Sequence, residues 1–586
     1  MTSHLLLITL GPVQEFIAQA RRTRDLWYGS HLLSELGRAA ARALIDCGAR
    51  LVLPSMEAGD PELEVCLAPL RANRQPPLSI ANKILAEVPP GLSPEQLARS
   101  ARAAVIAFWR DEVAAPVKQR CAGLLAADID EAWAEQIKSF LEFYATWAPL
   151  DDYAETRRAL EQTLAARKNL REFAPWTRQR GNVPKSSLDG ARETVLGRPR
   201  QRDAKLATRF RIADAEQLDA VGLVKRAGGN PGQFVPIVNV ALAPWVALGA
   251  REVADELDAL RAACREAGLA QVTRALPCCQ DFPFDASVLL PSRWTALFEE
   301  QNLRGDPETW GRDHVRPLLR QVGEPYPYVA CLVADGDRMG ALLDGLGSAD
   351  AHRELSRQLA AFSVRAREIV EKEHMGVLVY AGGDDVLAFV PVSQALACAE
   401  ALRHAFLEDR PQGNRPTLSV GLGIGHVMES MGDLLELGRA AEREAKHDRN
   451  SLGLVVDKRS GGRFAWRSSW DADPVSRLEG DSRLLGEALS SRKVYEIART
   501  FRSLPTPAVS LSPGWSRVLC SELRRSLARS GDGQLSPEAV GLQLDPKQDY
   551  ATSHEAVDAW IKRLLAARLF AMAQPWMRTH REEVPQ

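Results

Sequence analysis

The sequence predicts an α+β protein in which ferredoxin-like strand and helix patterns are combined with long helical regions. The first observation is the order of apolar segments over residues 328–447, where short runs suited to buried strands alternate with longer runs of helical periodicity. This order, β-α-β-β-α-β-α, is the split βαβ arrangement of ferredoxin-like domains with one extra helix. The second observation is that residues 236–322 and 466–586 show mostly helical patterns. The chain has 586 residues, enough for about three to five domains.

The N-terminal region is expected to begin with a strand at residues 4–10, followed by a long helix over about 13–47. Residues 51–54 and 83–88 have the short apolar pattern of further strands, and residues 93–170 have a helical, Trp-rich pattern. The apolar positions that give the first helix its spacing are Phe16, Ile17, Leu26, Leu32, Leu33 and Leu36.

A strongly basic stretch follows. Residues 157–211 contain 15 Lys or Arg against 5 Asp or Glu, on a chain whose total net charge is -2. Such a concentration favours a surface that faces phosphate groups, but an ion-paired, solvated helix face has the same composition, and charge alone does not separate the two. Arg178, Arg180, Lys185 and Arg202 are the candidate residues of such a surface.

The segment with the ferredoxin-like order is the most regular part of the chain. Its expected elements are a strand at 328–334, a helix, a strand at 377–381, a second apolar run up to Pro391, a helix at about 393–407, a strand at 418–424 and a helix through 434–447. The first helix has one buried face, marked by Leu355, Leu359, Phe362, Ala366 and Ile369. The expected domains are 1–215 with a helical, Arg-rich insert at about 93–211, then 216–324, 325–465 and 466–586, the last a helical bundle.

Four aspartates are expected to meet at one edge of this sheet. Asp335 and Asp337 end the first strand, and Gly382-Gly383-Asp384-Asp385 follows the next. A helical crossover makes these two strands parallel, so both end at the same side of the sheet. The glycines permit positive φ and a close approach to a ligand.

Clustered carboxylates raise one another's pKa unless a cation neutralises them, and oxygen-only ligands favour Mg²⁺ or Mn²⁺. Two such ions about 4 Å apart support in-line nucleotidyl transfer. Asp335, Asp384 and Asp385 are the expected metal ligands, with Asp335 and Asp384 favoured because each begins its turn. Asp337 has the alternative of capping the next helix. The alternative for the whole Gly-Gly-Asp-Asp segment is a plain hairpin turn.

Two further features fit a nucleotide site. Backbone N–H groups over Gly336, Asp337, Arg338, Met339 and Gly340 open a helix and are suited to hold a triphosphate. Lys446 is expected to reach these phosphates; its alternative is a surface ion pair with Glu442, four residues earlier. Ser356 is expected to contact a base, with a solvent-facing serine as the alternative.

The composition limits other classes of function. Nine cysteines are present without a CxxC pair, which is poor for a zinc site and fits a reducing cytoplasm. The apolar run over residues 5–10 has no basic segment before it and is read as a strand rather than a signal peptide. No run approaches the roughly eighteen apolar residues of a membrane span. The expectation is a cytoplasmic protein without a membrane partner.

Several motifs together resemble a known family. Asp335-x-Asp337, Gly-Gly-Asp-Asp at 382–385, TLSVGLGIG (417–425) and AEREAK (441–446) are similar to the nucleotidyl-cyclase palm shared with GGDEF-type diguanylate cyclases. More specifically, the chain resembles the large, Cas-ten-type subunit of type III-B (Cmr) CRISPR effector complexes. The segments that carry this likeness are GPVQEFIAQARRTRDLWYGSHLLSEL (11–36), IANKILAEVP (80–89), KSSLDGARE (185–193), LDAVGLVKR (218–226) and DGDRMG (335–340).

The resemblance implies two ferredoxin-like palm domains facing each other, with Gly-Gly-Asp-Asp only in the second, and additional helical domains. ATP would bind between the palms, contacted by the second-palm residues above, by Gly382 and Gly383, and by Gln14 and Ser30 of the first palm. The family joins ATP into cyclic oligoadenylate when target RNA is bound, whereas some relatives conjugate ATP to S-adenosylmethionine. Guide RNA, target RNA and other Cmr-type subunits are the implied partners.

There are two alternative functions, and the sequence departs from many relatives at one point. The palm could serve only as a scaffold, although a scaffold has no need for clustered carboxylates, and a free-standing diguanylate cyclase is disfavoured by the long helical regions. Many relatives begin with an HD nuclease domain, whereas the first palm strand is expected here at residue 4. His447-Asp448 is the sole His-Asp dipeptide and lacks upstream histidines. No HD nuclease activity is therefore expected of this sequence.

Overall fold

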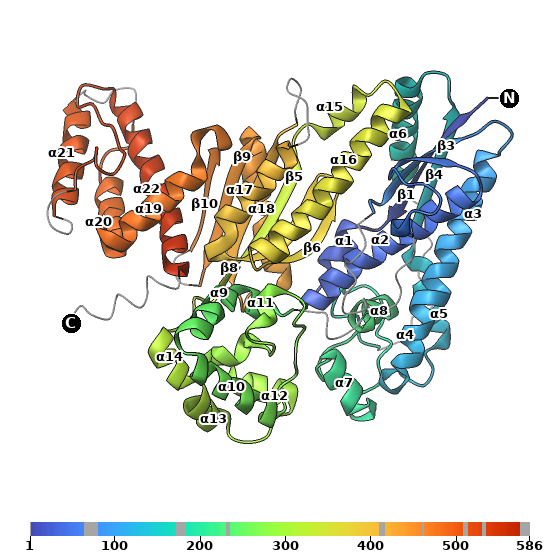
Figure 1. Ribbon diagram of the computed structural model, residues 1–586, viewed down its shortest axis with the longest axis horizontal. Helices are drawn as coiled ribbons and strands as arrows, with labels where there is room; N and C mark the ends of the chain where they lie inside the picture. Colours follow the sequence, from blue (N-terminus) through green and yellow to red (C-terminus); the bar gives the residue numbers. More distant parts are fainter. Residues whose placement is uncertain are drawn as a thin grey trace.

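The computed structural model describes residues 2–63, 80–170, 183–229, 235–408, 416–459, 462–507, 514–529 and 535–574. Two sheets form the centre of the molecule, with a group of helices below them and a further group at the C-terminal end (Figure 1). The predicted α+β class with two ferredoxin-like sheets and additional helices is confirmed.

The first sheet has four strands in the order β2-β3-β1-β4, with every neighbouring pair antiparallel. This is the ferredoxin-like order. Its strands are β1 (His4–Gly11), β2 (Arg50–Leu53), β3 (Lys83–Val88) and β4 (Glu142–Pro149). Strand β4 was not predicted, because residues 93–170 were read as helical. Only one of its eight residues is buried, so the apolar run that identifies a central strand is missing.

Helices cover both faces of this sheet. They are α1 (Gln14–Ala18), α2 (Thr23–Asp46), α3 (Pro94–Ala107), α4 (Ala115–Arg120), α5 (Asp130–Phe140) and α6 (Tyr153–Asn169), with a π-helical segment, Phe108–Ala114, extending α3. Leu6, Ile8 and Leu10 of β1 face the core with α2 and α3, whereas Leu5 and Leu7 face α6. The single helix predicted over 13–47 is two helices, because the chain turns between α1 and α2.

The helices after the first sheet fall in two groups. Next to the first palm lie α7 (Ala204–Phe210) and α8 (Ala220–Ala227). The linking group, drawn in green in Figure 1, lies beneath the second sheet, where α9 packs on β5 and β7. It comprises α9 (Ile237–Glu252), α10 (Ala254–Ala267), α11 (Pro277–Gln280), α12 (Trp294–Gln301), α13 (Pro307–His314) and α14 (Arg316–Val322).

The second sheet has six strands in the order β10-β9-β8-β5-β7-β6. They are β5 (Tyr328–Gly336), β6 (Val377–Gly382), β7 (Asp385–Pro391), β8 (Leu418–His426), β9 (Ser451–Lys458) and β10 (Gly462–Ser469). The predicted order over 328–447 is confirmed as β5-α-β6-β7-α-β8-α. Strands β9 and β10 were missed; β9 lies parallel to β8 and extends the ferredoxin-like unit after its last helix.

The helices of this region are α15 (Met339–Asp344), α16 (Ala349–Glu368), α17 (Val392–Leu407) and α18 (Met431–Asp448), with a π-helical end to α16 at Ile369–Glu373. The C-terminal group comprises α19 (Pro474–Glu487), α20 (Ser491–Arg502), α21 (Gly514–Ala528) and α22 (Tyr550–Ala573). Helix α22 packs on α17, so the C-terminal helices share one apolar core with the second sheet.

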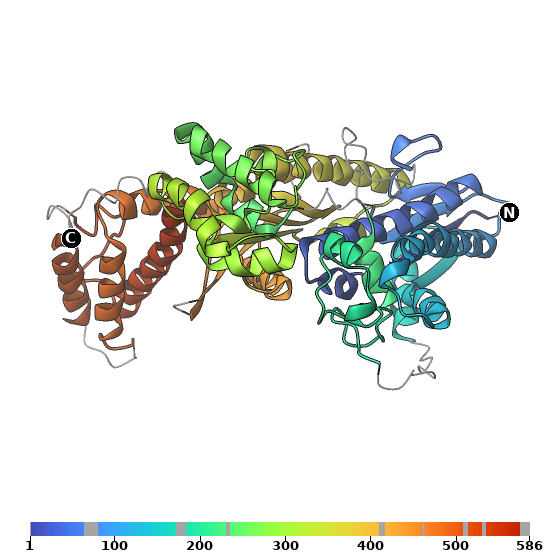
Figure 2. The same cartoon turned by 90° about the horizontal axis from the view of Figure 1, so that it is seen from below.

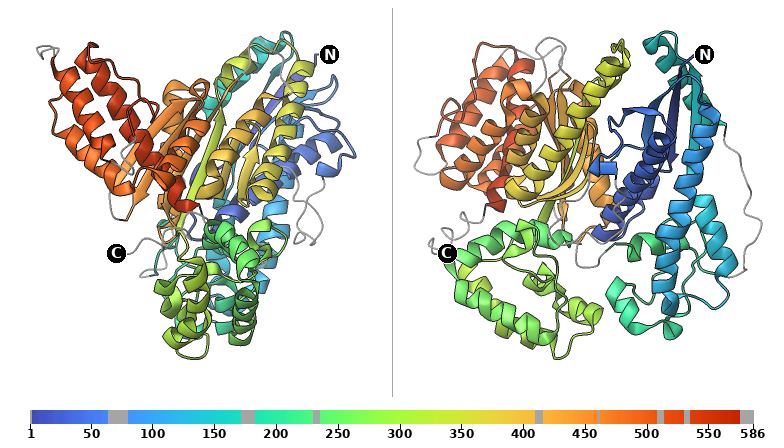
Figure 3. Two further views of the ribbon diagram at one scale, coloured as in Figure 1. Left: turned by 60° about the vertical axis from the view of Figure 1, so that its left-hand side comes forward. Right: turned by 45° about the vertical axis from the view of Figure 1, so that its right-hand side comes forward.

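The two palms lie side by side along the longest axis of the molecule (Figure 2), and Figure 3 shows them from two further directions. Helix α16 of the second palm packs on β2 of the first, and α2 of the first packs on β6 of the second. The backbone N–H of Ser55 donates to Oγ of Ser356 at 2.9 Å. Arg353 donates to the Leu51 carbonyl at 2.9 Å and pairs with Glu87. These contacts fix the spacing of the two palms.

Among the described residues, no single helix is long and apolar enough to cross a membrane; the bent pair α9 and α10 passes the same length and composition test jointly. Most of α9 is buried against the second sheet, as in the core helix of a folded domain.

Candidate functional site

Three of the predicted metal ligands meet at the end of the second sheet. Oxygen atoms of Asp335, Asp384 and Asp385 lie within 4.8 Å of one another. Strands β5 and β6 are parallel with β7 between them, so the end of β5 and the turn after β6 share one edge of the sheet. Among the described parts of the chain, this is the one group of three metal-ligating side chains at such distances.

The two glycine-containing turns have a local reason for their sequence. Gly383 has a φ of +77°, which a side chain would strain, and it lies in the two-residue loop between Gly382 and Asp385. At Gly336, an added Cβ would lie 2.8 Å from a carboxylate oxygen of Asp384. Glycine at this position is therefore what allows the two turns to approach each other.

The carboxylates are poorly compensated. Asp385 reaches the surface. Its pKa is nevertheless raised to about 9, first by desolvation of the carboxyl, and then by a hydrogen bond with Asp335 and by repulsion from Asp335 and Asp384. A carboxyl group that holds its proton at neutral pH marks a site with too much negative charge. Three oxygen ligands and this excess of charge fit a divalent cation of the Mg²⁺ or Mn²⁺ class.

Lys446 is the cation that the chain itself provides. It extends from α18, pairs with the Asp335 carboxylate, and donates to the backbone carbonyls of Asp335 and Gly336 at 3.0 Å each. Burial lowers the pKa of this ammonium, but the hydrogen bond and charge of Asp335 outweigh it, and the net pKa is raised. The ion pairs of Lys446 are with Asp335 and Asp337, so the alternative of a surface pair with Glu442 is wrong.

Asp337 is an anchor rather than part of the three-carboxylate group. Its side chain is 2% exposed and accepts from Thr417 Oγ1 at 2.7 Å and Ser419 Oγ at 2.9 Å. It also accepts from the backbone N–H of Asn450 at 2.9 Å. The alternative that it caps the following helix is wrong, because α15 follows Arg338, which has a φ of +56°, without a side-chain cap.

The remaining predicted nucleotide contacts have different environments. Ser356 is buried and bonded to the first palm through Ser55, so it is not the solvent-facing serine of the alternative reading. Ser30 is buried on α2, about two turns from the start of this helix, which packs against β6. Gln14 is exposed at the start of α1. Met339 and Gly340 begin α15, which is only six residues long and contributes a weak helix dipole.

The basic stretch is used less for surface contact than its composition suggested. Arg202 is 8% exposed and its guanidinium donates to the Gly197 carbonyl at 2.8 Å and the Glu216 carbonyl at 3.2 Å. Its predicted RNA or subunit contact is therefore not supported, because the group is turned inward. Lys185 is exposed and lies 4.0 Å from Glu193. Arg178 and Arg180 lie outside the described residues.

A buried ionic cluster beside the first palm was not found from the sequence. Arg226 of α8 pairs with Asp25 of α2 at 2.6 Å and with Glu216 at 2.8 Å, and the side chains of all three are almost completely buried. Lys225 donates to the carbonyl of Phe16 in α1 and to that of Gln19, which follows α1. The signal available in the sequence was the pair of basic residues at the end of an otherwise apolar segment, LDAVGLVKR.

These observations define a protein with two ferredoxin-like palms and one acidic edge. Comparison with known families matches residues 328–453 to the second palm domain of Cas10/Cmr2 and residues 5–114 to the N-terminal region of CRISPR-associated protein Cmr2. Residues 328–453 therefore carry a Cas10/Cmr2-type second palm, and residues 5–114 carry a Cmr2-type N-terminal region.

A curated relative and two solved structures are similar to this chain, the structures in their fold. The CRISPR system Cmr subunit Cmr2 of Pyrococcus furiosus is 24% identical over 602 positions, covering 86% of this chain and 67% of the relative. Cryo-EM structures of the type III-B Cmr-beta complex, in the apo state and bound to cognate target RNA, each contain a chain that matches with a TM-score of 0.66. Each match has 14% identity and covers 97% of this chain, with 82% and 83% of the respective chains covered.

Proposed function

We propose that this chain is the signalling subunit of a type III-B CRISPR RNA-guided complex. Its partners are then guide RNA, target RNA and other Cmr-type subunits, since the similar proteins are a Cmr2 subunit and a chain of a Cmr-beta complex bound to cognate target RNA. Its second palm joins ATP units into cyclic oligoadenylate when target RNA is bound. The single observation that carries the enzymatic part is the group of three carboxylates, which Lys446 compensates only in part, so that the pKa of Asp385 stays raised to about 9.

The residues divide the chemistry among them. Asp335, Asp384 and Asp385 are the ligands that would hold divalent ions at the edge of the sheet. When bound, such ions lower the pKa of an attacking sugar hydroxyl and neutralise a leaving pyrophosphate. Holding these carboxylates side by side costs free energy, and a ligand that pairs with them explains their presence.

Lys446 and Asp337 hold the acidic edge of the sheet in place through hydrogen bonds that are already formed in the unliganded protein. Lys446 is held by two backbone carbonyls, so its ammonium stays beside the carboxylates and adds a positive charge toward incoming phosphates. Asp337 ties the end of β5 to β8 through Ser419 and to the start of β9 through Asn450. Fixing these groups before the substrate arrives reduces the reorganisation that the reaction requires.

The test uses the assembled complex with ATP, Mg²⁺ or Mn²⁺, and matching target RNA. Nucleotide products are separated and identified by mass, with and without the RNA. We expect cyclic oligoadenylate from the unaltered complex and none from a complex carrying Asp384→Ala with Asp385→Ala. Asp457→Ala, an exposed residue of the same sheet, is the matched control and is expected to retain activity.

Two outcomes would change the proposal. One is a product that forms only when S-adenosylmethionine is added and whose mass corresponds to a conjugate of S-adenosylmethionine with ATP. The reaction at this site would then be conjugation and not cyclisation. If no product forms under any condition while the double substitution leaves assembly and RNA binding unaltered, the second palm is a scaffold.

A further inference from the structure

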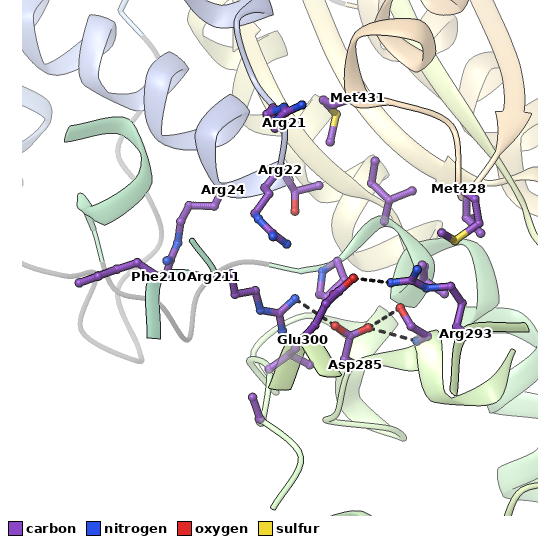
Figure 4. Close-up of a pocket in the computed structure, with 18 of the residues that line it drawn as sticks. Arg21, Arg22, Arg24, Phe210, Arg211, Asp285, Arg293, Glu300, Met428 and Met431 are labelled. Carbon is purple, nitrogen blue, oxygen red and sulfur yellow. Dashed lines mark hydrogen bonds and ion pairs between the residues drawn. The ribbon is translucent and has the colours of Figure 1, made fainter. Parts of the chain in front are cut away.

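A second polar site lies at the opposite end of the second sheet from the aspartates. It is a pocket of about 530 Å³ formed where the start of α2, the end of α7, the linking helices and the β8–α18 loop meet (Figure 4). Strand β8 runs from Leu418, beside Gly336, to His426, beside Tyr328. Eight residue steps of an extended strand separate the pocket from the acidic edge by about 26 Å.

The lining of this pocket is strongly basic. It contains six arginines, namely Arg21, Arg22, Arg24, Arg209, Arg211 and Arg293, against three acidic residues. Asp285 is already paired with Arg211 at 3.0 Å, and Glu300 with Arg293 at 2.8 Å. The third, Glu429, faces Arg459, which is not part of the lining, at 3.6 Å. The pocket therefore keeps an excess of positive charge after its internal pairs are counted.

Arg22 lies in the lining among these positive charges. Figure 4 shows its side chain extending from the start of α2 into the space above Arg211 and Asp285. No ion pair of Arg22 is found among the described residues. Burial and repulsion from Arg226 lower its pKa, and the same two causes lower the pKa of Arg24 to about 9. Both shifts show that a bound anion would be favourable here.

The shape and the other walls of the pocket limit the class of anion. The volume lies in the range of small-molecule sites, about 300–1,000 Å³. Ile237, Val238, Met428 and Met431 provide an apolar wall opposite the arginines. The first turn of α2, a helix of 24 residues, points the positive end of its dipole into the same space. A strand of RNA would instead need a continuous groove with exposed stacking platforms, and the one aromatic ring of the lining, Phe210, is fully buried.

We propose that this arginine pocket binds the phosphate chain of a free nucleotide, with the nucleoside against the apolar wall. The site is separate from the three aspartates and requires no divalent ion, because the arginines supply the neutralising charge. It extends the proposed function but does not depend on it, since binding is expected whether or not the second palm is an active enzyme.

The binding test removes the acidic site first. The full chain with Asp335, Asp384 and Asp385 each changed to Ala is titrated with ATP in metal-free buffer, and heat or a fluorescent ATP analogue reports binding. We expect one site to remain. Adding Arg22→Ala should weaken it at least about tenfold, as the loss of one charge-assisted contact predicts. Arg251→Ala, an exposed arginine of α9, is the matched control and should leave binding unchanged.

Further variants keep the test informative if Arg22→Ala is poorly folded. Glu300→Gln removes one carboxylate that competes for the arginines and should tighten binding several-fold. Arg22→Lys keeps the charge and should weaken binding less than the alanine variant. Tripolyphosphate should compete with ATP but bind more weakly, because it lacks the nucleoside.

Several results would overturn the proposal. These are absence of ATP binding to the triple-aspartate variant, or an equal effect of Arg22→Ala and Arg251→Ala. Equal affinity for ATP and tripolyphosphate would show that the nucleoside does not contact the apolar wall. A short single-stranded RNA without terminal phosphates that binds more tightly than ATP, with the same dependence on Arg22, would make the pocket an RNA contact. Failure of the binding test leaves the cyclase assay unaffected, so the two proposals fail separately.

Discussion

The two palms share a strand order but differ in the charge at the end of their first strand. In the second palm, Lys446 from the helix after the fourth strand reaches the end of β5 and meets carboxylates there. In the first palm, Lys168 from the corresponding helix, α6, reaches the end of β1 and donates to Thr9 Oγ1 at 3.3 Å. Burial lowers the pKa of Lys168, whereas the pKa of Lys446 is raised.

This difference separates the requirements of the fold from those of the site. The first palm forms the same sheet with a hydroxyl where the second has carboxylates, so the topology itself does not need the acidic group. Among the described residues, the three-carboxylate group occurs at the second palm alone. Residues that destabilise a fold and are not needed by its topology are expected at functional sites.

The largest expected effect comes from neutralising one member of the acidic group. In the assembled complex, Asp385→Asn should reduce nucleotide product formation about 100-fold or more, because a metal ligand and its charge are lost. In metal-free buffer at pH 8, the same variant should unfold at a temperature about 1–3 °C higher, since it no longer has to hold a proton on a carboxyl whose pKa is raised to about 9. Product assays and thermal scans measure the two effects. If product formation and the unfolding temperature both fall, Asp385 is needed for the fold as well as for the site, and the contrast between the palms is wrong.

The first palm should be most sensitive at its buried ionic cluster. Asp25→Ala leaves Arg226 with one carboxylate partner in a site without solvent and is expected to lower the free energy of unfolding by about 3 kcal/mol. Asp46→Ala, on the same helix with a side chain 67% exposed, should change it by less than about 0.5 kcal/mol. Urea unfolding of the full chain checks both values, and similar effects at the two positions would show that the cluster is not a structural element.

The acidic edge should also give the metal-free protein a distinctive pH dependence. The pKa of Asp385 is raised from 3.8 in the unfolded chain to about 9 in the folded one, so between these values the folded state binds more protons. Stability contributed by this proton is present at acid pH and is lost as the pH rises toward 9. Unfolding free energies measured from pH 5 to 9 should fall with pH in the unaltered chain.

The Asp385→Asn variant should lose this part of the slope. Saturating Mg²⁺ or Mn²⁺ should reduce it as well, because the ion takes the place of the proton. An identical pH profile in the variant would assign the slope to other groups.

The smallest expected effect concerns the contact between the palms. Ser356→Ala removes the acceptor for the Ser55 N–H and should cost about 1 kcal/mol. Ser363→Ala is the control, since this serine is on the same helix, is equally buried and bonds within its own helix to Leu359. Hydrogen exchange at Ser55 should increase in the first variant only, and equal exchange in both would remove the contact from the palm interface.

The sequence predicted the elements whose pattern is local to one segment. It did not predict features in which burial depends on packing against distant segments. The order of elements from β5 to α18 follows from periodicity within each segment, and the crossover rule then places Asp335 beside Asp384. Strand β4 was missed because only one of its eight residues is buried, so it shows no apolar run. Asp337 and Lys446 were recognised as site residues, but their bonds to Ser419 and to backbone carbonyls depend on packing that the residue order does not reveal.

Charge patterns were misleading for a related reason. Arg202 contributes to the basic composition of residues 157–211 but points inward, because its guanidinium satisfies carbonyls of a loop without regular hydrogen bonds. Arg157, at the start of the same stretch, is 1% exposed and pairs with Glu161 and Asp344 of the second palm. Composition counts such residues as surface charge, whereas only the folded chain shows which of them face solvent.

Helix α16 connects the strand that carries Asp335 to the strand that leads to Asp384, and the first palm holds its flank through Ser55, Leu51 and Glu87. The contacts are made near the start of α16, which the chain enters from the end of β5, whereas the other end of the helix leads to the start of β6, away from Asp384. The first palm therefore holds the helix on the side of the acidic edge, and the spacing of the palms bears on the connection that follows Asp335.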